Sequence, residues 1–355
     1  MHIPDGYLSP ATCVVLYGGA APFWYVSLRK IRRQLHTRVI PLISVFSAFS
    51  FVIMMFNLPL PGGTTGHAVG MGVTTVVLGP WGSILAISVA LTIQAFFFGD
   101  GGITALGANC FNMAIVGSLV TYLVYRWIAG RSPLTSRRRM FSAAIAGYVA
   151  INTAALFAAV EFGVQPLLFK DAMGAPLYAP YPLSVAIPAM MIGHLTFAGA
   201  AEAIITGGIV AYLQRSDASL LAPFSGLTVE GAATESRTSI LGRLWAGLAA
   251  LMLLTPLGVL AVGTAWGEWS VKDFADAAAR EKIIAASQHR TLPAGVPEGL
   301  HRLSSAWTAP FPDYAPQFIR SEPVGYMLSA MFGVGIILAV LWLGRKFLLR
   351  GGNTP

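Results

Sequence analysis

The sequence predicts an all-α polytopic membrane protein, in which a seven-span core is followed by two C-terminal spans that flank an external loop domain. Of the 355 residues, 55% are hydrophobic and only 11% are charged, whereas soluble domains carry about 25% charged residues. The mean hydropathy is +0.67, and apolar runs of about 20 residues, enough to cross a bilayer, recur along the chain. We expect spans at 8–28, 40–57, 68–80 (short), 81–98, 103–128, 140–162, 182–213, 244–264 and 324–343.

Four clusters of Lys and Arg indicate how these spans are oriented. The clusters follow the first, fifth, seventh and last spans and begin at Arg29, Arg126, Arg215 and Arg345. Because cytoplasmic loops carry an excess of Lys and Arg, nine spans with an external N-terminus would place all four clusters inside. The net charge of +8 is therefore a topology signal and does not indicate nucleic-acid binding. No basic n-region precedes the first span, so we expect a retained Met1 and no cleaved signal peptide.

Composition divides the chain into three parts. We expect residues 1–215 to form the seven-span core, 216–243 a polar cytoplasmic linker, and 244–355 a two-span accessory module. Within this module, residues 265–323 are polar and include a short amphipathic helical pattern. We expect them to form the external loop domain.

The N-terminus carries the strongest candidate for a binding site. The α-amine of Met1, the His2 amide nitrogen and the His2 imidazole can close two fused chelate rings on one metal ion. His67, in a loop rich in Gly and Thr, could add a fourth nitrogen, and the predicted topology places both histidines outside. Four nitrogens in a plane suit Ni(II) or a similar late divalent ion. The alternative is a disordered terminus and an ordinary loop histidine.

Polar residues at the mouths of two spans are candidates for bracing this site. They are Gln94, Asp100, Asn109 and Asn112. Polar groups in such positions are costly in a membrane and are usually functional. They could orient the metal ligands through hydrogen bonds, or they could cap helices and satisfy local packing.

The seventh predicted span contains two further polar residues, His194 and Glu202. They are eight residues apart, so a helix would place them on nearly one face. An intramembrane carboxylate needs a partner, which an arginine or a subunit contact could supply. Structural pairing and transport chemistry are both open readings. Cys13 and Cys110 lie in apolar segments and are expected to be packed thiols.

Several catalytic motifs are absent from the sequence. It has no Gly-x-x-x-x-Gly-Lys-Ser/Thr phosphate loop, and no Gly-Lys pair occurs at all, so ATP is not bound by that route. The His-Glu-x-x-His motif of zinc proteases is also missing. We therefore expect a binding or transport protein that is not an enzyme and needs no catalytic cofactor.

These features together resemble the CbiM/NikM family, the substrate-capture (S) components of energy-coupling-factor transporters for cobalt and nickel. The resemblance covers about residues 1–215 and rests on the segments Met1–Leu8, Phe98–Gly102 and Gly107–Ala114, together with His67. It implies a seven-span core with an external N-terminus. It also implies Ni(II) or Co(II) as the transported substrate, bound by the Met1 amine, by backbone and side chain of His2, and by His67.

The C-terminal part is similar to the NikN-type accessory module, whose usual motif is Pro-Asp-Gly-Leu. Here Pro297-Glu298-Gly299-Leu300 carries glutamate in place of aspartate. The resemblance implies a membrane coupling (T) subunit and two cytoplasmic ATPase subunits as partners, in the cell's inner (cytoplasmic) membrane. The alternatives are a stand-alone divalent cation channel or secondary carrier, and a membrane metal sensor, neither of which explains a site at the extreme terminus.

Overall fold

The computed structural model describes residues 1–32, 39–60, 64–225, 237–261, 263–287, 292, 295–316 and 318–350. Within them, regular structure is almost entirely helical, with a single two-stranded sheet. Seven of the described helices are long and apolar enough to cross a membrane, and α2 is a shorter apolar helix. The chain is an all-α polytopic membrane protein, as the sequence predicts.

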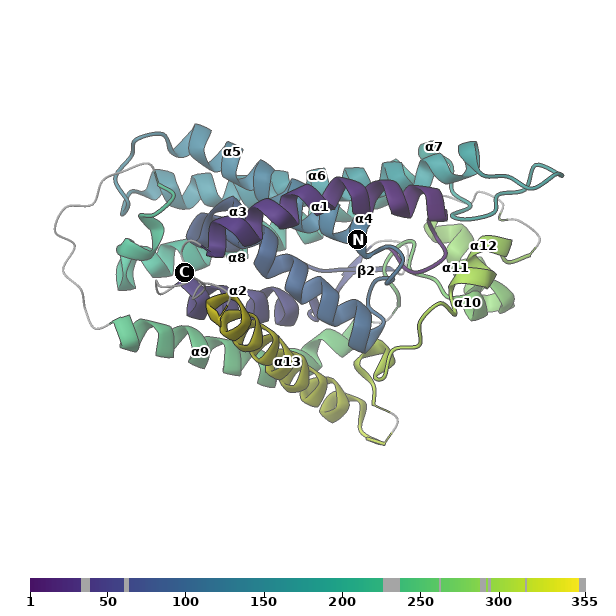
Figure 1. Cartoon of the computed structure of the whole chain (residues 1–355). Coiled ribbons are helices and arrows are strands. Elements are labelled where there is room, and N and C mark those ends of the chain that lie inside the picture. Colours follow the sequence, from purple (N-terminus) through teal and green to yellow (C-terminus); the bar gives the residue numbers. More distant parts are fainter. Residues whose placement is uncertain are drawn as a thin grey trace.

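The elements fall into a core and a C-terminal module. The core comprises α1 (Pro10–Arg32), α2 (Val39–Met54), β1 (Leu58–Leu60), β2 (Thr64–Gly66), α3 (Met71–Ile93), η1 (Gln94–Phe98), α4 (Leu106–Asn109), η2 (Cys110–Val116), α5 (Gly117–Ala129), α6 (Arg137–Leu168), α7 (Leu183–Gly193), η3 (His194–Ala198), α8 (Gly199–Ser216) and η4 (Ala218–Leu221). The C-terminal part comprises α9 (Arg237–Leu254), η5 (Thr255–Leu260), α10 (Val271–Ala275), α11 (Ala277–Ala286), α12 (Glu298–Leu303), η6 (Pro312–Tyr314) and α13 (Glu322–Arg350). Figure 1 shows the long helices as an elongated bundle with α10, α11 and α12 gathered at one end.

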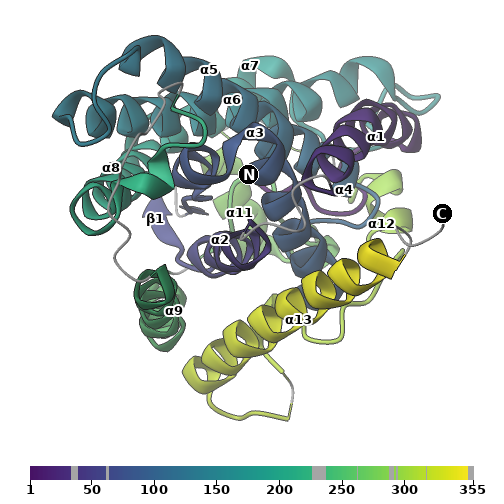
Figure 2. The same cartoon turned by 60° about the vertical axis from the view of Figure 1, so that its left-hand side comes forward.

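Small residues allow α6 to pack closely against several neighbours. Its buried positions include alanines that recur every three or four residues, among them Ala143, Ala146, Ala150, Ala154 and Ala158. Small side chains let helix backbones approach closely in lipid. Accordingly, α6 contacts α5, α7 and α8, and Figure 2 shows this packed layer along one side of the bundle.

The α3 helix reverses direction at Gly79. This residue has φ 70° and ψ 173°, a conformation that glycine adopts without steric cost. The Thr75 hydroxyl donates to Ser83 Oγ at 2.9 Å, although eight residues of straight helix would separate them by about 12 Å. The predicted segments 68–80 and 81–98 are therefore two arms of a helical hairpin. The first arm rises only about 12 Å and does not cross the roughly 30 Å hydrocarbon core by itself, so it is not the separate short span that was expected.

Basic residues lie near this reversal. Lys30 Nζ is 4.3 Å from the centre of the Trp81 ring, and Arg126 donates to the Phe224 carbonyl at 3.4 Å. Gly79 faces the Phe224 ring. The second arm of α3 leads from this basic end to Asp100 at the other end of the bundle. Residues 226–236 of the predicted linker lie outside the described residues.

The N-terminal segment is buried in the middle of the bundle (Figures 1 and 2). Met1 is 2% exposed and His2 is 1% exposed. Backbone bonds join this segment to the core, because Gly102 N donates to the Ile3 carbonyl at 2.8 Å and Ala179 N donates to the Tyr7 carbonyl at 3.0 Å. The terminus is therefore an ordered, interior part of the structure.

The C-terminal loop domain covers this segment from the other side. The Tyr7 hydroxyl donates to the Trp269 carbonyl at 2.8 Å, and Thr65 N donates to the Thr264 carbonyl at 3.2 Å beside β2. A Cβ added to Gly6 would lie 2.8 Å from Leu300 Cα, so the Pro-Glu-Gly-Leu motif packs directly against the N-terminal turn. The first nine residues are thus enclosed between the core and the accessory module.

Candidate metal-binding site

Two histidines from different segments stack inside the bundle. The rings of His2 and His67 have centroids 4.9 Å apart and an interplanar angle of 29°, and both residues are buried. His67 Nδ1 lies 3.0 Å from the Ala68 carbonyl, so this nitrogen carries the proton and Nε2 keeps its lone pair. Nε2 of both rings is buried without a hydrogen-bond partner. Buried polar atoms are normally paired, so the free Nε2 of His67 indicates a ligand position.

The backbone adds two further nitrogens. The Met1 amine lies 3.2 Å from Glu268 Oε1, and the buried His2 amide donates to no acceptor within the described residues. Orphaned buried amides are rare in proteins. The amine, the amide and the two imidazoles therefore supply four nitrogens in one enclosed place.

Asp100 holds the His2 imidazole. Its Oδ1 lies 2.8 Å from His2 Nδ1, and its other oxygen accepts hydrogen bonds from Gln94 Nε2 at 3.2 Å and from the Tyr314 hydroxyl. Burial alone would raise the pKa of Asp100, but the charge of His2 and its hydrogen bond outweigh burial and hold that pKa well below its usual range. Asp100 therefore remains a carboxylate beside the histidines.

Asn109 fixes the backbone next to the chelating atoms. Its Oδ1 accepts from Ile3 N at 2.8 Å, and its Nδ2 donates to the Ile3 carbonyl at 3.1 Å. Gln94, Asp100 and Asn109 thus all connect to the N-terminal segment. Asn112 Nδ2 instead donates to Glu161 Oε2 on α6 at 2.8 Å. Its Oδ1 is buried without a partner in the described structure, so a bracing role for Asn112 stays a prediction.

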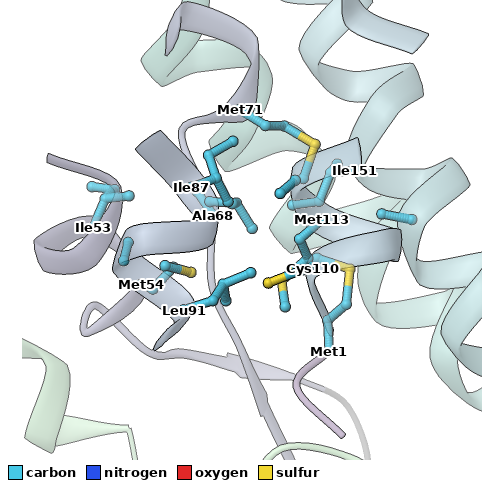
Figure 3. Close-up of a cluster of buried hydrophobic side chains, with 14 of the residues drawn as sticks. Met1, Ile53, Met54, Ala68, Met71, Ile87, Leu91, Cys110, Met113 and Ile151 are labelled. Carbon is cyan, nitrogen blue, oxygen red and sulfur yellow. The ribbon is translucent and has the colours of Figure 1, made fainter. Parts of the chain in front are cut away.

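Apolar packing anchors both ligand-bearing segments. Figure 3 shows the Met1 and Ala68 side chains in one cluster with Met113 and Leu91. Burial lowers the pKa of His67 well below 6.5, and the nearby His2 and the terminal amine lower it further. His67 is therefore neutral near pH 7, the protonation state that a metal ligand requires.

Glu202 holds the backbone that directly follows His67. Its two oxygens accept hydrogen bonds from the backbone amides of Val69, Gly70 and Gly72 at 2.8–2.9 Å. These are unpaired donors at the start of α3, which a carboxylate satisfies well. The partner of Glu202 is thus backbone, and among the residues that the structure describes no arginine pairs with it. His194, which precedes it on the same long helix, bonds the Met190 carbonyl through Nδ1 at 2.8 Å.

Two residues of the accessory module at this site were not predicted from the sequence. Glu268 contacts the Met1 amine and Tyr314 contacts Asp100. Asp313 and Tyr314 have φ values of 55° and 60°, the only positive values among the described non-glycine residues. Such conformations cost free energy and cluster at functional sites. The polar composition of residues 265–323 marked the region, but no spacing singled out these positions.

Residues 2–220 match the family described as the cobalt uptake substrate-specific transmembrane region, CbiM, and residues 242–350 match the PDGLE domain. The chain belongs to the CbiM family. The two matched ranges leave unmatched a short stretch within the polar segment between core and module. Homologues of this family are named as nickel or cobalt transport proteins.

Relatives with the same two-part organisation match along the whole chain. A fused nickel transport protein, NikMN, of Rhodobacter capsulatus is 57% identical, with 99% of each chain covered. A probable fused nickel transport protein, LarMN, of Lactiplantibacillus plantarum is 41% identical, with 96% of each chain covered. A solved structure titled as a transition metal transporter is 51% identical and has a TM-score of 0.58; the match covers 61% of this chain and 94% of that one.

Proposed function

We propose that this chain captures Ni(II) or Co(II) from the external side of the cell's inner membrane and delivers it inward. The ligands are the Met1 amine, the His2 amide and imidazole nitrogens, and His67 Nε2. The observation that carries this proposal is the buried, unpartnered Nε2 of His67, whose ring stacks on His2 beside the terminal amine. Relatives named for nickel and cobalt transport support the choice of metal.

On capture, the Met1 amine and the His2 imidazole exchange their carboxylate partners for the metal ion. Without metal, Glu268 holds the Met1 amine and Asp100 holds His2 Nδ1. Closing the two chelate rings requires the amine to lose a proton and leave Glu268, the amide to lose its proton, and Nδ1 to turn from Asp100 to the ion. His67 needs no such change because it is already neutral. The Asp100 carboxylate stays close and offsets part of the charge of the ion.

The donor set bears on metal choice. Four nitrogens in a plane favour Ni(II) over Co(II), and they favour Cu(II) still more by intrinsic affinity. Rejection of copper must then come from delivery or from metal availability. We therefore do not expect the site by itself to select Ni(II) against every other first-row divalent ion.

Delivery would require partner proteins. The chain lacks a phosphate loop, so we propose that it is the substrate-specific subunit of an energy-coupling-factor importer with a membrane coupling subunit and two cytoplasmic ATPases. The basic residues near Gly79 and Phe224, at the end of the second arm of α3 away from Asp100, support an external N-terminal site.

The experiment is nickel uptake into proteoliposomes that contain the chain alone or with its coupling and ATPase subunits. The proposal predicts uptake only in the complete assembly, dependent on ATP hydrolysis and unaffected by a protonophore. Uptake by the chain alone that a protonophore abolishes would identify a secondary carrier instead. Passive uptake by the chain alone would identify a channel, and binding without uptake in any assembly would identify a sensor.

A further inference from the structure

Glu161 of α6 is a buried carboxyl group that the proposed capture step does not use. The residue is 8% exposed, and within the described part of the chain no Lys, Arg or His forms an ion pair with it. An ionised carboxyl is costly in an apolar interior unless a cation pairs with it, and such a group takes up a proton instead. The surroundings of Glu161 therefore favour its neutral form.

The hydrogen-bond partner of Glu161 is a side-chain amide that has one atom left unpaired. Asn112 Nδ2 donates to Glu161 Oε2 at 2.8 Å, while Asn112 Oδ1 is buried without a partner in the described structure. An ionised carboxyl only accepts hydrogen bonds, whereas a protonated one also donates. A proton on Glu161 lets the carboxyl donate to Asn112 Oδ1, so that acid and amide exchange two hydrogen bonds and the buried oxygen is satisfied.

The segments packed against α6 bring no cation to this pair. Arg126 and Arg215 belong to the far end of the bundle, where α6 begins. Glu202 faces Gly147, which fourteen residues of helix separate from Glu161 by about 21 Å. The described titratable side chains of these segments are Tyr7, Cys13, Cys110, Tyr122, Tyr125, Arg126, His194, Glu202, Tyr212 and Arg215, whereas α3 and α7 carry none. The Asn112 amide is therefore the group that meets the Glu161 carboxyl.

This pair joins the two helical segments that hold the N-terminus. Asn109, which bonds the N-terminal backbone through both of its side-chain polar atoms, lies one turn before Asn112. Gln165 lies one turn after Glu161 on α6, and its Oε1 accepts from Ser9 N at 2.9 Å. Asn112 itself lies in the π-helical turn η2, and such turns are frequent at functional positions. The pair therefore sets the spacing of the two segments around the chain that carries the proposed ligands.

We propose that Glu161 is a proton-binding site, and that its neutral form, paired with Asn112, keeps the N-terminal chelate in the geometry that captures metal. Loss of the proton leaves a carboxylate oxygen against an amide oxygen. The pair then opens, and Asn109 and Gln165 no longer hold the terminal segment in one position. The inference rests on the proposed function, because that segment carries the proposed ligands. Glu161 and Asn112 are positioning residues and do not touch the metal.

The first test detects the proton by infrared spectroscopy of the metal-free, full-length chain. A protonated carboxyl has a carbonyl stretch that an ionised carboxylate lacks. At about pH 6, where exposed carboxyls are ionised, we expect this band in the unaltered chain and its loss in Glu161→Gln. Glu281→Gln, which changes an exposed carboxyl of α11, should keep the band. Spectra of the unaltered chain and Glu161→Gln that do not differ in this band would overturn the proposal.

The second test measures Ni(II) affinity as a function of pH, with a competing chelator as metal buffer. Glu161→Gln keeps an amide that can exchange both hydrogen bonds with Asn112 but cannot ionise. Buried glutamates titrate as high as about pH 8–9, so the measurements extend from below to above that range. Across it we expect the unaltered chain to lose about fivefold in affinity relative to Glu161→Gln, the size of effect that one positioning hydrogen bond produces. Glu281→Gln should follow the unaltered chain.

The outcomes separate this inference from the proposed function. Parallel pH profiles of the unaltered chain and Glu161→Gln would overturn the inference, because a proton at Glu161 would then have no effect on metal binding. Absence of tight Ni(II) binding from both chains at every pH would instead contradict the proposed chelate, whatever the infrared spectra show.

Discussion

The amine of Met1 and the carboxylate of Glu268 lie 3.2 Å apart, although 267 residues separate them in the sequence. Glu268 belongs to the loop domain of the accessory module. The same module reaches His2 indirectly, because Tyr314 donates to Asp100 and Asp100 holds the imidazole. The conformation of Met1 and His2 is therefore set jointly by the core and the module.

If the Met1 amine is a metal ligand, Glu268 competes with the metal for it. Glu268→Gln removes this competitor while it leaves every proposed ligand in place. We expect Ni(II) affinity to rise by up to about fivefold, the equivalent of the roughly 1 kcal/mol that a partly exposed ion pair contributes. Isothermal titration calorimetry measures the change, with Glu281→Gln, an exposed carboxylate of α11, as the control. A loss of affinity would indicate that Glu268 is itself a ligand.

Tyr314 stabilises the docked accessory module. Tyr314→Phe keeps the ring that stacks on Phe98 with centroids 4.7 Å apart and removes only the hydroxyl that bonds Asp100 and Gln94. A hydrogen bond to a charged group contributes about 1.5–3 kcal/mol, so the metal-free protein should unfold at a lower temperature in detergent. Tyr25→Phe, at a position that is 65% exposed, should have no effect. Equal midpoints for both variants would contradict this role.

Glu202 holds the loop that carries His67. Glu202→Gln replaces one acceptor oxygen with an NH₂ group, which then faces backbone donors at the start of α3. We expect a loss of roughly 3 kcal/mol in stability and weaker Ni(II) binding, because the His67 loop loosens. Thr206→Val is the control, since Thr206 donates to Glu202 only at 3.5 Å. Thermal unfolding and nickel titration of the two variants provide the comparison, and normal binding by Glu202→Gln would refute the positioning role.

The buried state of His67 predicts a pH dependence of the metal-free protein. Its pKa in the folded chain lies well below 6.5, chiefly through burial, so the unfolded chain binds more protons as pH falls through about 6.5. Stability should therefore decrease from pH 7 to pH 5. Asp100 does not contribute in this window because its folded pKa is lowered and it remains ionised. Unfolding midpoints measured between pH 5 and pH 7 should vary less in His67→Gln than in the unaltered chain. If the midpoint changes equally with pH in both, other groups cause the pH dependence.

Much of the architecture could be read from the sequence because apolar length and charge position are local signals. The two apolar segments on either side of Gly79 were predicted as separate spans. Their hairpin geometry was not, because it depends on the Thr75–Ser83 contact and on packing against Phe224.

The candidate site shows the same division. The charge-based topology predicts His2 and His67 on the same side, and Asp100 was a candidate because it lies at the mouth of a span. Glu268 and Tyr314 were not expected. Both lie in an irregular segment where no periodicity relates one residue to a distant one. Asn112 lies one turn beyond Asn109, and its Nδ2 donates to Glu161, a partner that the sequence does not predict.

The most direct measurement compares Ni(II) and Co(II) binding to the purified chain with its native N-terminus and with one glycine added before Met1. The extension displaces the terminal amine while His2 and His67 remain. Met1 lines a cavity of about 190 Å³, which offers room for the added glycine. If the terminal chelate is the capture site, tight binding is lost although the thermal unfolding midpoint of the metal-free protein is retained. Unchanged tight binding by the extended chain would show that the Met1 amine is not a ligand and would contradict the account.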